Sequence, residues 1–185
     1  MKCNNNAAVL GQYTQEGNTY NIKSKCILDI NGRGNSVYIG NKVMNTLIHD
    51  ELIYIHIYGD NNTVVIDDAV TYGKSCSIFL GQNSSFKLGS DCMLSNDIKF
   101  YVRDNEQIII GEHVWFGLRS SGSSPLNIGV GSIVGANSCV TGSYSNNIVA
   151  VGNPALTLKT NIAWHRHRDE HDMYTLPAKY RQTTV

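Results

Sequence analysis

A period of six residues in the second half of the chain constrains its fold more than any other feature. Apolar or small residues stand at this spacing: Ile110, Phe116, Gly122, Ile128, Val134 and Val140. Glycine directly follows four of these residues, as Gly111, Gly117, Gly129 and Gly135. A helix repeats about every 3.6 residues and a strand every two, so neither explains the pattern. The period predicts a β-helix of very short strands, each with one inward side chain, and glycine is expected at the turns because it tolerates positive φ.

The same organisation extends upstream in a looser form. The segments 31–40, 58–67 and 80–89 each contain glycine, an Asn-Ser or Asn-Thr step and two apolar residues that flank one position. Their last apolar residues and Ile110 lie 27, 22 and 22 residues apart, which are coil lengths with small insertions. We expect an all-β, single-domain solenoid over 21–154, a cap or frayed segment over 1–20, and a short C-terminal helix and tail over 155–185.

Composition excludes several classes of protein. The formal net charge is zero, which gives no indication of a nucleic-acid partner. No apolar run is long enough to span a membrane and the N-terminus has no signal-peptide core, so neither membrane insertion nor secretion is expected. The five cysteines are scattered without a C-x-x-C pair, as in a reduced cytoplasmic protein. We expect Cys92 and Cys139 to be small core residues.

Three segments together carry a resemblance to a known family. IGEHVWFG (110–117), IGVGSIVGANSCVTG (128–142) and VAVGNPALTLKTNIAW (149–164) are similar, in order and spacing, to the hexapeptide-repeat acyltransferases, and most of all to the branch that O-acetylates sugars of bacterial surface polysaccharides. The resemblance implies a left-handed parallel β-helix, a homotrimer, acetyl-CoA as acyl donor, a saccharide acceptor and an active site in the groove between subunits. No metal is expected.

The resemblance also implies roles for individual residues. Ala136 and Thr141 match positions that line the pantetheine arm of the cofactor, and Trp115 matches an aromatic residue in the groove. The remaining positions implied at the cofactor are Gly152, Asn153 and Pro154, in the loop that closes the last coil, and Lys159, near the CoA phosphates. Leu156 departs from the basic residue usual at its position, a function that Arg166 or Arg168 could take over.

The catalytic base is the main departure from the family. Relatives carry a histidine in a loop before the HVW coil, whereas the corresponding stretch 96–111 has none, and Asp104 is the only remnant of that loop. His113 is the one histidine in the motif-bearing coils, and a neutral imidazole is a suitable base for a sugar hydroxyl. His113 is therefore the candidate catalytic residue, with a structural role as the alternative.

Other candidate groups have simpler interpretations. His56 alternates with Ile55 and Ile57, as an outward strand residue does, while His49 has acidic neighbours. The histidines and acids of 165–172 do not share one helical face, so a metal site is not expected there. Gly122 stands at an inward position, where it could widen the coil or admit a ligand.

These observations favour an acetyl-CoA-dependent O-acetyltransferase that acts in the cytoplasm on a sugar hydroxyl of a bacterial surface polysaccharide or its precursor. Two alternatives remain open at this stage. The first is a catalytically silent homologue with a structural or binding role, which the missing loop histidine favours. The second is an N-acyltransferase on an amino sugar, because an amine needs less help from a base.

Overall fold

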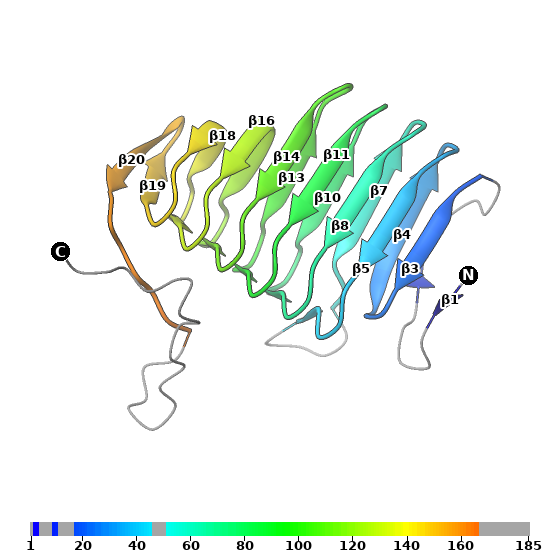
Figure 1. Ribbon diagram of the computed structural model, residues 1–185, viewed down its shortest axis with the longest axis horizontal. Helices are drawn as coiled ribbons and strands as arrows, with labels where there is room; N and C mark the ends of the chain where they lie inside the picture. The colour runs from blue at the N-terminus through cyan, green and yellow to red at the C-terminus, as the bar shows by residue number, and fades with distance from the viewer. Residues whose placement is uncertain (1, 4–8, 11–16, 46–50, 167–185) are drawn as a thin grey trace.

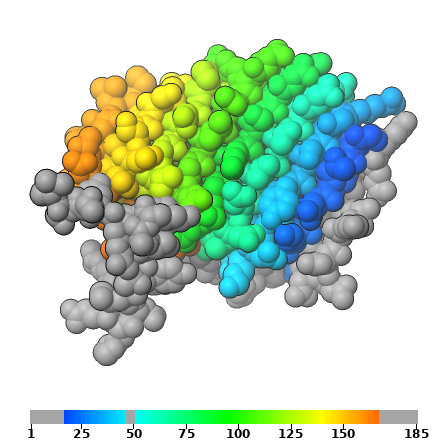
Figure 2. Space-filling view, in the orientation of Figure 1, coloured from blue at the N-terminus to red at the C-terminus, as the bar shows by residue number. Residues whose placement is uncertain are grey.

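The computed structural model describes residues 2–3, 9–10, 17–45 and 51–166. In this part of the chain every regular element is a β-strand, and the strands wind into a left-handed parallel β-helix, as predicted. Figure 1 shows the coils stacked side by side from β1 to β20, and in Figure 2 they form successive bands on the surface. Within the described residues no helix could cross a membrane.

Each complete coil has three faces. The first face contains β1 (Lys2–Cys3), β3 (Thr19–Ile22), β5 (Ser36–Ile39), β8 (Thr63–Ile66), β11 (Ser85–Leu88) and β14 (Gln107–Ile110). The second face contains β6 (Met44–Asn45), β9 (Thr71–Tyr72), β12 (Met93–Leu94), β15 (Trp115–Phe116), β17 (Ile133–Val134), β19 (Val149–Gly152) and β20 (Ala155–Lys159). The third face contains β2 (Val9–Leu10), β4 (Cys26–Asn31), β7 (Tyr54–Tyr58), β10 (Ser77–Leu80), β13 (Lys99–Val102), β16 (Ser121–Ile128) and β18 (Cys139–Tyr144). The long strand β16 passes from the third face to the first and pairs with both β13 and β14.

The core is one apolar column inside the coils. The five apolar residues of the six-residue pattern are at most 1% exposed, so the predicted inward positions are confirmed. Each such side chain contributes about 1.5–3 kcal/mol through burial. Gly122 also faces inward, but it neither widens the coil nor admits a ligand. A Cβ atom there would lie 2.8 Å from the ring of Phe100 and 2.9 Å from Leu126, whose side chains fill the space.

The glycines of the repeat serve a different purpose from the one predicted. Positive φ occurs two residues later, at His113, Arg119, Gly131 and Asn137, and not at Gly111, Gly117, Gly129 or Gly135. At Gly117 a Cβ atom would lie 2.7 Å from the backbone nitrogen of Ala136 in the next coil. Glycine is needed because adjacent coils approach too closely for a side chain.

Asp and Asn side chains bridge the corners between successive coils. In each bridge a side-chain oxygen accepts a hydrogen bond from a backbone N–H of the preceding coil, at 2.7–3.0 Å. The acceptors are Asp60, Asp68, Asn96, Asp104 and Asn146. The Asp104 carboxylate accepts from the Gln82 N–H, so this side chain helps to hold two coils together.

Two predictions about the C-terminal coils are wrong. No helix forms over 155–166; Ala155–Lys159 is strand β20, which turns back and pairs antiparallel with β19, and the rest of the predicted tail lies outside the described residues. Cys92 is buried as expected, but Cys139 is half-exposed because it points outward from β18, next to the inward Val140.

Candidate active site

Four of the cofactor positions implied by the resemblance gather at one corner of the β-helix. Ala136 follows β17, and Gly152, Asn153 and Pro154 form the turn between β19 and β20 in the next coil. Ser138 links the two coils, since its hydroxyl accepts a hydrogen bond from the Gly152 N–H at 3.0 Å. All four residues are exposed, so a ligand could reach them from solvent.

Thr141 and Lys159 extend this surface in two directions. Thr141 is exposed on β18 of the third face, where its hydroxyl donates to the Pro125 carbonyl at 3.4 Å. Lys159 is exposed at the far end of the β19–β20 hairpin, opposite Val149. The hairpin turn and Lys159 are therefore separated by roughly 10 Å along the strand.

Trp115 lies on the second face between these positions and His113. Its strand β15 pairs with β12 and β17, and its indole N–H donates to the Ser95 hydroxyl at 3.1 Å. Its ring centroid is 5.9 Å from that of Trp164. The two indoles lie against each other over the second face, where Trp164 is buried and Trp115 is partly exposed.

His113 sits at the corner between the first and second faces, in a fully formed set of contacts. Its Nδ1 is 2.6 Å from a carboxylate oxygen of Asp91, and its Nε2 is 3.0 Å from the carbonyl oxygen of Trp164. The imidazole stacks on the Trp164 ring at a centroid distance of 4.0 Å, and the residue is only 4% exposed. Both ring nitrogens therefore lie within hydrogen-bonding distance of an oxygen atom of the protein.

The segment after β20 holds Trp164 over His113. The Trp164 indole N–H donates to the His113 carbonyl at 3.1 Å, and Arg166 lies 3.0 Å from the second carboxylate oxygen of Asp91. Arg166 also donates to the Cys92 carbonyl and to the Thr71 hydroxyl. Arg166 is thereby engaged with the coils, and it does not lie free to replace the missing basic residue at Leu156; Arg168 is outside the described residues.

Asp91 is a site residue that sequence reasoning missed. It precedes His113 by 22 residues, which is one coil, so the spacing alone places the two at the same corner of successive turns. An imidazole paired with a carboxylate is the arrangement that orients a catalytic base, and it is equally an arrangement that anchors a buried histidine.

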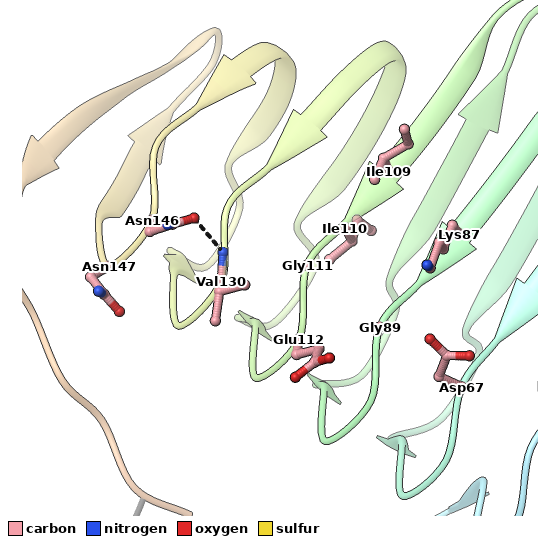
Figure 3. Close-up of a pocket in the computed structure, with 10 residues that line it drawn as sticks. All are labelled: Asp67, Lys87, Gly89, Ile109, Ile110, Gly111, Glu112, Val130, Asn146 and Asn147. Atoms are coloured by element: carbon pink, nitrogen blue, oxygen red, sulfur yellow. Dashed lines mark hydrogen bonds between the residues drawn. The ribbon is translucent and has the colours of Figure 1, made fainter. Parts of the chain in front are cut away.

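A shallow groove of about 480 Å³ runs along the corner between the first and second faces (Figure 3). Side chains from successive coils line it, among them Asp67, Lys87, Glu112 and Asn146, whose amide oxygen accepts from the Val130 N–H. None of the cofactor positions implied by the resemblance lines this groove.

The remaining histidines and the buried cysteines add no activated nucleophile or metal ligand set to this site among the described residues. His56 faces outward on β7, as its alternation predicts, while His49 lies outside the described residues. Burial raises the pKa of Cys76 to about 11 and that of Cys92 to about 12, so both thiols are protonated at neutral pH and are poor nucleophiles. Within the described residues no group of three or more His, Cys, Asp or Glu could hold a metal ion; the cluster of 165–172 lies mostly outside them.

Comparison with known proteins relates this chain to acetyltransferases. No family model matches it. An Escherichia coli K12 protein, WbbJ, provisionally named a lipopolysaccharide biosynthesis O-acetyl transferase, is 32% identical over 136 residues, which is 71% of this chain. The chain spans 64% of the length of that relative.

The crystal structure of the polySia specific acetyltransferase NeuO is similar in fold. It superposes with a TM-score of 0.59 at 23% sequence identity, over 89% of this chain and 84% of that one. This likeness shows a shared architecture. This chain therefore shares its left-handed β-helix with NeuO, and its sequence is similar to that of WbbJ.

Proposed function

We propose that this protein is an acetyl-CoA-dependent O-acetyltransferase that acts on a sugar hydroxyl of a bacterial surface polysaccharide or its precursor. The observation that carries the proposal is the 32% identity to WbbJ over 136 residues, since that relative is named for O-acetyl transfer in lipopolysaccharide biosynthesis. Because acetyl-CoA is a cytoplasmic metabolite, a cytoplasmic location is part of the same proposal.

The surface around Ala136 is the proposed donor site. Ala136, Gly152, Asn153 and Pro154 are exposed at one corner, and the neighbouring backbone can accept or donate hydrogen bonds to a pantetheine amide. Thr141 offers a hydroxyl on the adjoining face. Lys159 has no ion-pair partner among the described residues, so its ammonium group is available for a phosphate of CoA.

His113 is the proposed base, oriented by Asp91. A base would take the proton of the sugar hydroxyl as the oxygen attacks the thioester carbonyl, and CoA would leave as the thiolate or thiol. For this role Nε2 must be unprotonated and accessible. In the arrangement described here Nε2 contacts the Trp164 carbonyl, so catalysis by His113 requires the 160–166 segment to move away.

A homotrimer is also part of the proposal. Leu156 and Leu158 on β20 are 73% and 70% exposed, although they are large and apolar. Apolar side chains at the end of an open sheet favour coverage by another chain. A neighbouring subunit could cover them and form, beside Trp115, the groove between subunits that the resemblance implies.

One observation favours a second candidate, a catalytically silent homologue with a binding or structural role. His113 is 4% exposed and both of its ring nitrogens have partners, as expected of a histidine that holds the C-terminal segment in place. Such a homologue would have the fold and the proposed donor surface but no catalytic base.

The experiment that tests the donor site is thermal unfolding with and without CoA. A ligand that binds only the folded state at 100 times its Kd stabilises it by about 2.7 kcal/mol, so a clear rise in Tm is expected. Ala136→Glu should abolish the rise because its larger, charged side chain would occupy the path of the pantetheine arm, while Ser145→Glu, an equal charge change at an exposed position away from that corner, should not. No rise in the unsubstituted protein at millimolar CoA would refute the proposed donor site.

A further inference from the structure

A row of stacked rings runs across the outside of the third face. His56 on β7, Phe79 on β10 and Tyr101 on β13 occupy the same register position in successive coils. Their ring centroids are 4.8 and 5.2 Å apart and their planes differ by 7° and 8°. Because the spacing matches that of the strands, each ring covers the face of the next.

The row ends abruptly at Tyr101. The next strand, β16, places Ser123 opposite Tyr101 and Ser121 opposite Lys99. The small serine side chains cannot cover the second face of the Tyr101 ring, and Tyr101 is 44% exposed. One ring-sized position in the row is therefore open.

Beside this open position, Tyr101 also lines a pocket of about 390 Å³ with a charged rim. The pocket is lined by Asp97, Lys99, Tyr101, Arg119, Ser120 and Ser121. Arg119 lies 3.8 Å from the Asp97 carboxylate, a long contact that leaves hydrogen-bonding capacity on both groups. Lys99 forms no ion pair among the described residues. An aromatic face thus lies beside a carboxylate, two cations and hydroxyl groups.

We infer that this pocket is a subsite for one pyranose ring of the acceptor glycan, which stacks on Tyr101 and fills the open position in the row. A pyranose has an apolar C–H face for the tyrosine ring and hydroxyl groups at its edge for Asp97 and Lys99. The inference rests on the proposed function and specifies where its acceptor binds.

A saccharide suits the pocket better than an apolar surface of another chain. Burial beneath an apolar partner would desolvate Asp97 and Lys99 without offering them hydrogen bonds, which is costly. Hydroxyl groups offer such bonds. Aromatic walls with a few convergent polar groups are also the usual composition of small-ligand sites.

The position of the pocket relative to the proposed donor site supports this assignment. Thr141 lies on β18, which pairs with β16, so it is two strands away from β13 on the same face, or roughly 10 Å. Ala136 belongs to the same corner as Arg119, one coil further on, where the Asn137 N–H donates to the Leu118 carbonyl. A glycan held at Tyr101 can therefore extend toward the acyl donor.

Saturation-transfer NMR on four variants tests the subsite, with the methyl pyranosides of glucose, N-acetylglucosamine and glucuronic acid as probes. Tyr101→Leu removes the stacking ring, Ser123→Tyr fills the open position with a ring of the protein, and Tyr101→Phe retains the ring. Tyr54→Leu is the matched control, because Tyr54 is 40% exposed on the same face but away from the pocket. Circular dichroism establishes that each variant is folded.

We expect at least one probe to receive saturation on its ring C–H protons from the unsubstituted protein, Tyr101→Phe and Tyr54→Leu. Binding should be about tenfold weaker in Tyr101→Leu and in folded Ser123→Tyr, a factor that one lost aromatic stack produces. No transfer in the unsubstituted protein, or equal transfer in all variants, would overturn the inference. So would a changed solution mass of Ser123→Tyr with unchanged saccharide binding, which would mean that this face joins copies of the chain.

Thermal unfolding with CoA on the same samples separates the two claims. Stabilisation by CoA without saccharide contact at Tyr101 would refute this subsite and leave the proposed function intact. Saccharide contact without stabilisation by CoA would refute the proposed donor site and leave the subsite intact.

Discussion

Replacement of His113 separates a catalytic role from a structural one. His113→Ala removes a short hydrogen bond to the Asp91 carboxylate and a ring stacked on Trp164. A hydrogen bond to a charged group contributes about 1.5–3 kcal/mol and an aromatic stack about 0.5–1.5 kcal/mol. We expect the variant to lose about 3 kcal/mol of unfolding free energy, which corresponds to roughly 6–12 °C in Tm for a chain of this size.

A second variant distinguishes the two roles despite this loss. His113 has a φ of 55°, a region that asparagine tolerates better than most residues. His113→Asn keeps a side-chain N–H for Asp91 but cannot act as a base. It should therefore recover a good part of the lost Tm. If His113 is the base, its kcat should nevertheless stay about 10²–10⁴-fold below that of the unsubstituted protein.

Calorimetry and an acetyl-transfer assay on the same preparations give both quantities. Unchanged kcat in His113→Asn would exclude His113 as the base. Unchanged Tm in His113→Ala would refute the structural reasoning, since a 4%-exposed side chain with these contacts cannot be removed without cost.

Three further predictions concern the fold and assembly. Gly117→Ala should lower the unfolding free energy by about 1–3 kcal/mol, measured by urea titration, because its Cβ would press on the Ala136 backbone. Arg119→Gly should leave the unfolding free energy unchanged or raise it, because Arg119 has a positive φ. Burial raises the pKa of Cys92 from 9.0 to about 12, so the protonated thiol favours the folded state. This contribution to the free energy of unfolding is fully present below pH 9 and falls as the pH rises above 9. Cys92→Ala should therefore show a smaller fall in Tm between about pH 9 and 11 than the unsubstituted protein. Light scattering should give the mass of a trimer, and Leu158→Asp should lower that mass; a monomer at micromolar concentration would contradict the proposed assembly.

The repeat made the fold predictable, but the sequence did not reveal why its glycines are there. A period of six specifies which side chains point inward, and Ile110 and Phe116 are buried accordingly. Both positive φ and close approach select glycine, and only the distance between coils distinguishes them. At Gly117 that distance is decisive, because the Ala136 backbone occupies the place of a Cβ atom.

Contacts between coils were partly predictable from spacing. Asp91 and His113 are one coil apart, as are Phe79 and Tyr101, so a 22-residue register places each pair at neighbouring positions. The ring stack and the open position at Ser123 also depend on which side chains face outward. Both can be predicted once the strands are aligned in this register.

The C-terminal segment was not predictable in the same way. The alternation of Leu156 and Leu158 with polar residues did not distinguish a strand from a helix. The segment forms a strand because it pairs with the free edge of β19. The contact of Trp164 with His113 spans 51 residues and depends on that turn. Its discovery required the three-dimensional structure, because no repeat extends beyond β19.

Acetyl transfer from acetyl-CoA to a saccharide tests the central claim most directly. The purified protein would be incubated with acetyl-CoA and a panel of bacterial surface oligosaccharides, and mass spectrometry would detect an added acetyl group that mild alkali removes, as it does an O-ester. The account predicts an alkali-labile acetyl group on at least one saccharide, dependent on both protein and acetyl-CoA. An alkali-stable product would instead indicate N-acetylation, and no product on any saccharide, with no stabilisation by CoA, would contradict the account.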